Sequence, residues 1–111
     1  MEKKSVFDQV EITRSAIIQF RIALMVVDGD EEITSQWHRT ALEPGQSLDE
    51  QMALVNADLA MKGYPPISPE AIEAVRGYVD ITHTPAVIAA FEQAKADAAA
   101  EKDALRNPPP P

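Results

Sequence analysis

Apolar and polar residues alternate along residues 18–26, and this pattern predicts a β-strand with one buried face. The odd positions include the polar residues Gln19 and Arg21. Branched and aromatic side chains, which suit a pleated and half-buried surface, dominate the stretch. The even positions are all apolar: Ile18, Phe20, Ile22, Leu24 and Val26.

A turn and a second strand follow this first strand. Asp28-Gly29 is a pair that readily adopts the positive φ angles of a hairpin turn. The next strand is expected over residues 31–42, so the chain is organised around a β-hairpin at about residues 16–42.

The hairpin register decides which side chains share a face. Loops of two or four residues both keep the same parity, and both place Ile33 and Trp37 on the face of Phe20. The opposite, solvated face is then expected to carry these residues: Gln19, Arg21, Thr34, Gln36, His38 and Thr40.

The residues before the hairpin can add a further strand. Residues 1–5 are expected to be frayed. Val10, Ile12 and their polar neighbours predict a short strand at about residues 10–13, or the bent beginning of the long one. A turn near Arg14-Ser15 would give a three-stranded meander, the more stable arrangement.

Three helices are expected after the sheet. Ser47 and Glu50 form a capping-box pattern, and an apolar stripe of Leu48, Met52, Val55 and Leu59 follows up to Gly63. Ser68-Pro69 starts a second helix, whose core positions are Ile72, Val75 and Val79 and which should end by about Val79.

Thr84-Pro85 opens the third helix, which has Val87, Ile88, Phe91 and Ala94 on its inner side. Its alanine-rich part, residues 94–105, has strong helix propensity but little to bury, so its end frays or packs on a partner chain. The proline-rich residues 107–111 cannot be helical and are expected to form a disordered tail.

The predicted fold class is therefore α+β. An antiparallel sheet of two or three strands precedes three helices, which pack on one of its faces. Residues 1–106 are expected to form a single domain, because the chain has 111 residues and ordinary apolar content.

Charge bears on the class of partner. The net charge of −8 disfavours binding to nucleic acid, which needs clustered Lys and Arg. Solubility explains this charge most simply, and a DNA mimic that inhibits a host nucleic-acid enzyme is the alternative. No run of apolar residues approaches a membrane span.

No residue constellation in the sequence indicates catalysis, a cofactor or a metal. The chain has no cysteine and two histidines, and a zinc site needs more ligands than these provide. His38 is expected at the surface, and His83 is expected to make a loop contact. The acids of Asp28–Glu32 lack the ligand spacing of a calcium loop. We therefore expect a protein that is not an enzyme.

Trp37 has two possible roles in the predicted fold. It is expected to be a core aromatic, and the alternative is a partly exposed anchor of a protein interface. The uncovered sheet face and the strand edges could receive another protein or a second copy. On that reading the possible interface residues are Gln19, Arg21, Trp37 and His38.

The stretch from Ile18 to Ile67 resembles small proteins encoded in the structural gene regions of tailed phages and prophages. The resemblance rests on these features of the chain: Gln19-Phe20-Arg21, Asp28-Gly29, His38-Arg39-Thr40, Pro44-Gly45, Met52, Val55-Asn56, Leu59 and Gly63-Tyr64-Pro65. It implies a virion or assembly role, most often in the tail, and location in the particle or the host cytoplasm. The partners that it implies are phage structural proteins or further copies of the chain.

Overall fold

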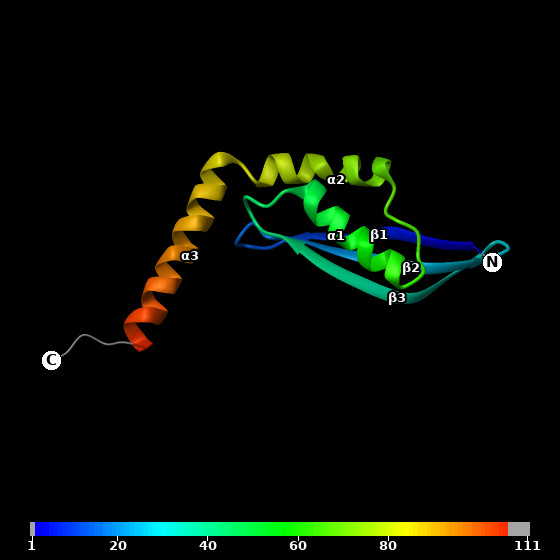
Figure 1. The fold of residues 1–111 in the computed structure, drawn as a ribbon. Coiled ribbons are helices and arrows are strands. Elements are labelled where there is room, and N and C mark those ends of the chain that lie inside the picture. Colours follow the sequence, from blue (N-terminus) through cyan, green and yellow to red (C-terminus); the bar gives the residue numbers. More distant parts are fainter. Residues whose placement is uncertain (1, 107–111) are drawn as a thin grey trace.

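The computed structural model describes residues 2–106, and it has an antiparallel sheet followed by three helices (Figure 1). The strands β1 (Glu2–Ile12), β2 (Ile18–Asp28) and β3 (Glu31–Leu42) lie in the order β1-β2-β3. The helices are α1 (Leu48–Met61), α2 (Pro69–Thr82) and α3 (Pro85–Arg106). The predicted α+β class is confirmed, with the three-stranded form of the sheet.

Strand β1 is longer than the predicted strand at residues 10–13. It begins at Glu2, which pairs with Val27, so the expectation of a frayed start is wrong for residues 2–5. Contacts with the α1–α2 connector add to this pairing: the Ser5 hydroxyl donates to the Pro65 carbonyl at 2.6 Å, and the Lys3 ammonium lies over the Tyr64 ring. Met1 lies outside the described residues.

The core fills the space between one face of the sheet and helices α1 and α2, which lie on the same side of it (Figure 1). Phe20 is 1% exposed at the centre of β2, and its ring centroid lies 5.4 Å from that of Phe7 on β1. All five even positions from Ile18 to Val26 face this side, as predicted, although Val26 is only half-buried. The core is built from these buried residues: Ile18, Phe20, Ile22, Leu24, Leu42, Leu48, Met52, Val55, Leu59, Tyr64, Ile67 and Val75.

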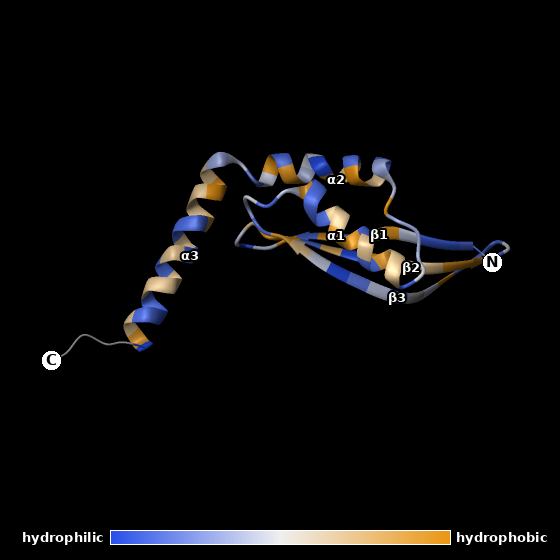
Figure 2. Cartoon of the chain, viewed as in Figure 1, coloured by the Kyte–Doolittle hydropathy of each residue, from blue (hydrophilic) through white to orange (hydrophobic). Residues whose placement is uncertain are grey.

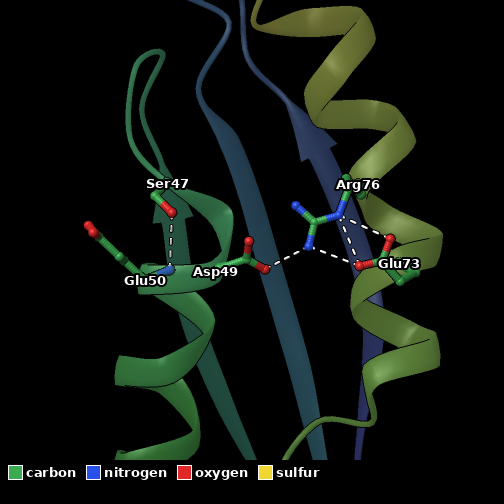
Figure 3. Close-up of polar contacts among 5 residues, drawn as sticks. All are labelled: Ser47, Asp49, Glu50, Glu73 and Arg76. Atoms are coloured by element: carbon green, nitrogen blue, oxygen red, sulfur yellow. Dashed lines mark hydrogen bonds and ion pairs between the residues drawn. The ribbon is translucent and has the colours of Figure 1, made fainter.

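Helix α1 begins and ends where the sequence predicts. The Ser47 hydroxyl accepts a hydrogen bond from the Glu50 backbone N–H at 3.2 Å, and Gly63 follows the helix with a φ of 81°. The Glu50 carboxylate, in contrast, points away from Ser47 (Figure 3). Only the serine half of the predicted capping box is therefore formed, and it satisfies one free N–H of the first turn.

An ion-pair cluster joins the start of α1 to α2 (Figure 3). Arg76 lies 2.6 Å from Asp49 through Nη2, and its Nε donates to both carboxylate oxygens of Glu73 at 3.0 Å. These hydrogen bonds, the one with Glu73 first, raise the pKa of Arg76 above its ordinary value. The cluster therefore links the two helices on their solvent-exposed side.

Helix α2 runs to Thr82, one turn beyond the predicted end at Val79. His83 follows it, and its Nε2–H donates to the Ala16 carbonyl at 2.7 Å. The predicted loop contact of His83 is thereby confirmed. Ala16 has a positive φ of 63°, and its carbonyl ties the β1–β2 turn to the corner between α2 and α3.

Helix α3 leaves the rest of the molecule (Figure 1). Val87, Ile88 and Phe91 are half-buried near its start, whereas every residue from Glu92 to Arg106 is exposed. Ala94, predicted on the inner side, is among the exposed residues. The predicted disordered tail, residues 107–111, lies outside the described residues. Polar and apolar residues alternate along the free part without forming a buried side (Figure 2), and the molecule measures 71 × 29 × 21 Å. No helix within residues 2–106 is long and apolar enough to cross a membrane.

Candidate functional site

The sheet has a second face, on which the described structure places no helix (Figure 1). We call this surface the open face. Its side chains come in cross-strand rows, because antiparallel partners point to the same side of a sheet. Ala23 pairs with Val6 on one side and with Trp37 on the other, while Arg21 pairs with Gln9 and with Arg39. The open face includes Lys4, Val6, Gln9, Glu11, Gln19, Arg21, Ala23, Met25, Val27, Glu32, Thr34, Trp37, Arg39 and Ala41.

A β-bulge decides which residues of β3 reach the open face. Near the turn, Val26 pairs with Ile33, the pairing expected with a four-residue loop, although Asp28 also pairs with Glu31 and leaves a loop of Gly29-Asp30. The register then shifts between Met25–Thr34 and Leu24–Gln36. The extra residue at position 35 turns the rest of β3 over. Trp37 consequently pairs with Ala23 and lies on the open face. A register without the bulge would have placed it on the opposite face, with Phe20.

Trp37 is therefore the partly exposed anchor and not the core aromatic that we expected. Its side chain is 44% exposed. Ile33 keeps the predicted face but is 50% exposed, because it lies toward the hairpin tip, away from the buried core residues of β2. Leu42 is fully buried in the core that Trp37 was expected to fill.

Trp37, Arg21 and Asp8 form a connected group on the open face. The Arg21 guanidinium carbon lies 4.5 Å from the centre of the Trp37 ring, a cation–π distance. Its Nε donates to the Asp8 carboxylate at 2.8 Å, and its Nη2 donates to the same oxygen. Asp8 occupies the bulge of β1, where the register shifts between Phe7 and Gln9. Arg21 is thus held on both sides, which preorganises the exposed indole ring for contact with a partner.

A second arginine adjoins this group. Arg39 lies directly opposite Arg21 on β3, a like-charge pair that costs energy across two strands. Among the ion pairs of residues 2–106, Arg21 joins Asp8, whereas none includes Arg39. The two arginines border a shallow hollow of about 510 Å³, which is lined further by Gln9, Glu11, Gln19, Phe20, Thr40 and Ala41.

Three of the four predicted interface residues come together, and one does not. Gln19, Arg21 and Trp37 all lie on the open face. The placement of His38 on that face is wrong, because the bulge at position 35 pairs it with Ile22 and turns it toward α1. Gln36 and Thr40 change face for the same reason, and the Thr40 hydroxyl accepts a hydrogen bond from the Gln51 amide at 2.6 Å.

The sequence interpretation missed Val6, Met25 and Arg39 as parts of this surface. A signal for Met25 was present, since the odd positions Ala23, Met25 and Val27 are too apolar for a fully solvated strand face. Ala23 is in fact 3% exposed, which shows that its neighbours cover the middle of the open face. No comparable signal marks Arg39, whose face depends on the bulge.

His38 contributes to the packing between β3 and α1. The Lys62 ammonium lies 3.2 Å from its Nδ1, which suits a neutral imidazole that accepts a hydrogen bond. Burial lowers the pKa of His38 below its ordinary value, the Lys62 charge lowers it further, and Asp58 acts in the opposite direction. The folded protein therefore binds this proton less readily than the unfolded chain does.

This lowered pKa predicts a pH dependence of stability. Above about pH 6.5 the ring is neutral in both states, so its contribution is fully present. As the pH falls below that value, the unfolded chain takes up the proton first and the free energy of unfolding decreases. We expect thermal melts at about pH 7 and about pH 5.5 to differ more for the wild type than for His38→Gln. An equal difference in both proteins would contradict this assignment.

Within residues 2–106, no three side chains of His, Asp or Glu are grouped so that they could hold a metal ion. The acids of Asp28–Glu32 lie around the hairpin turn, where Asp28 pairs with Glu31. The candidate site considered further is the open face, where an aromatic ring, two guanidinium groups and amide side chains lie together.

Comparison of this chain with protein-family models, with curated proteins and with solved structures finds no match.

Proposed function

We propose that this protein is a non-enzymatic binding protein that acts through the open face of its sheet, and that it serves as a tail-associated or assembly protein of a phage. The observation that carries the binding role is Trp37, which is 44% exposed, lies on an uncovered sheet and stacks on an arginine that Asp8 holds. Exposed Trp and Arg side chains are the residues most enriched at the energetic centres of interfaces.

The open face has the layout of a protein-binding surface. Val6 is 39% exposed beside the buried Ala23, and Met25 lies in the next row, so apolar side chains share the row of Trp37 and the row beside it. Arg39, Glu11, the amides of Gln9 and Gln19, and the ion pair of Lys4 with Glu32 form the polar part of the surface. An apolar centre with a polar rim is the usual anatomy of such interfaces. The phage assignment is supported by the resemblance of residues 18–67 to proteins of tail gene regions.

The experiment is an affinity pull-down from phage-infected or prophage-induced cells, read by mass spectrometry at low and moderate salt. We expect tail or baseplate proteins to be recovered by the wild type and lost with Trp37→Ala. Tyr78→Ala is the matched control, because Tyr78 is an aromatic residue on α2 that is 53% exposed. A loss with both variants, or with neither, would contradict the open face as the binding surface.

The Trp37→Ala variant should remain folded in this assay. Truncation of Trp37 should lower the free energy of unfolding by only about 1–2 kcal/mol, because part of its ring is already in water. Recovery of a basic nuclease or polymerase that is lost as salt rises would overturn the structural role and favour an acidic inhibitor.

A further inference from the structure

The outer edge of β3 is a second surface without a partner in the described structure. The sheet order β1-β2-β3 leaves the backbone of β3 paired on one side only. Such an edge presents free N–H and C=O groups, which can pair with another strand. Strand β1 is the other edge, and its Lys3 and Ser5 side chains contact the connector after α1 from the helix-covered face. The β3 edge carries two exposed apolar residues, Ile33 and Trp37.

The bulge gives this edge an unusual symmetry. Before it, Glu32 and Thr34 share the open face, and after it Trp37 and Arg39 do. If two copies of β3 pair antiparallel about a two-fold axis between residues 35 and 36, Thr34 lies opposite Trp37 and Glu32 lies opposite Arg39. Both pairs then have their side chains on the same face, as antiparallel pairing requires. Without the bulge, this register would place the two residues of each pair on opposite faces of the sheet.

Charge favours the same arrangement. The β2–β3 turn is acidic, since Asp28 ends β2, Asp30 lies in the turn, and Glu31 and Glu32 begin β3. Arg39 lies near the other end of β3. Antiparallel pairing brings the start of each strand beside the end of the other. Each Arg39, which no ion pair within residues 2–106 includes, would then lie opposite Glu32 of the other copy, whose carboxylate also lies 3.2 Å from the Lys4 ammonium of its own chain. The arrangement also separates the two acidic turns of a chain whose net charge is −8.

We propose that the β3 edge binds the β3 edge of a second copy of this chain, giving a two-fold dimer with one continuous six-stranded sheet. The open faces of both copies lie on the same side of that sheet, so the dimer presents two Trp37 clusters. This inference does not depend on the proposed function, since it concerns the strand edge and its test needs no other protein.

The first test measures the molar mass of the purified protein by sedimentation equilibrium from about 1 μM to about 1 mM. We expect the wild type to dimerise. Glu32→Arg or Arg39→Glu places like charges opposite each other, and each should weaken dimerisation about tenfold or more. The doubly reversed variant, Glu32→Arg with Arg39→Glu, should regain it. So should an equal mixture of the two single variants, which can form the complementary heterodimer.

The control is Glu11→Arg, which reverses an exposed acid on the other edge strand and should leave dimerisation unchanged. A wild type that stays monomeric over the whole range would overturn the proposal. So would charge reversals without effect, or a double variant that fails to regain the dimer although its thermal melt shows that it is folded. An effect of Glu11→Arg alone would place the interface at β1 and likewise overturn it.

A second test uses the absence of cysteine from the chain. Gln36 is exposed next to the proposed axis, so Gln36→Cys should form a disulfide-linked dimer under mild oxidation. Ala53→Cys, at an exposed position on α1, is the control and should remain monomeric. Equal cross-linking of both variants, or cross-linking of the control alone, would contradict pairing through β3.

Discussion

Replacement of Phe20 by alanine should lower the free energy of unfolding by about 3–5 kcal/mol. The side chain is 1% exposed in the middle of the central strand and packs against the Phe7 ring. Its removal loses the transfer free energy of the ring and leaves a cavity that the neighbouring strands cannot close. Because small domains have only about 5–15 kcal/mol of stability in total, this one change should remove a large part of it.

Chemical denaturation followed by circular dichroism measures this effect, with the midpoint and the slope both fitted. Phe91→Ala is a matched control, since Phe91 is only half-buried at the start of α3. Its loss should be less than half as large. A change below about 1 kcal/mol for Phe20→Ala would mean that the core is not organised around this ring.

Replacement of Leu59 by alanine should cost about 2–5 kcal/mol. Leu59 is completely buried on the inner side of α1, and it belongs to the stripe that attaches this helix to the sheet. Alanine is as good a helix former as leucine or better, so the loss reports packing and not helix propensity.

The same helix supplies the comparison for Leu59. Leu54 is 64% exposed on the outer side of α1, and Leu54→Ala should change the free energy of unfolding by less than about 0.5 kcal/mol. Equal losses at the two positions, measured by the same denaturation, would contradict the observed orientation of α1.

Features that depend on a local period could be predicted from the sequence. The stripe of α1, its serine cap and the even positions of β2 follow directly from the spacing of apolar residues, because each period fixes a face. Helix α2 agrees less well with the prediction: only Val75 is buried, while Ile72 and Val79 lie at the margin of the core. The sequence pattern shows which side of α2 faces the core, but it does not show how much of that side the neighbouring elements cover.

The two bulges explain most of what was missed. Residue 35 lies between Thr34 and Gln36, with no Gly or Pro to mark an interruption, so simple alternation placed Trp37 and His38 on the wrong faces. The bulge at Asp8 likewise puts Phe7 and Val10 on one face, although they are three residues apart. The apolar residues of β1 therefore do not alternate over its whole length, and the sequence pattern predicted too short a strand. A single inserted residue inverts every later side chain of a strand, and nothing in the local composition announces it.

The candidate site depended on these same bulges. Gln19 and Arg21 could be assigned to the open face, because β2 is uninterrupted between the two edge strands. The group formed by Trp37, Arg21 and Asp8 could not, since it requires one bulge in each edge strand to bring its members together.

The projecting helix α3 also changes how this molecule moves through solution. A compact chain of this length has a radius of gyration of about 13 Å, whereas the Cα atoms here give 18.4 Å. A particle this elongated experiences more friction than a sphere of equal mass. A single copy should therefore elute early from a gel-filtration column and tumble slowly in relaxation measurements, in both cases imitating a larger protein. Calibration against globular standards would overstate its mass even where only one copy is present.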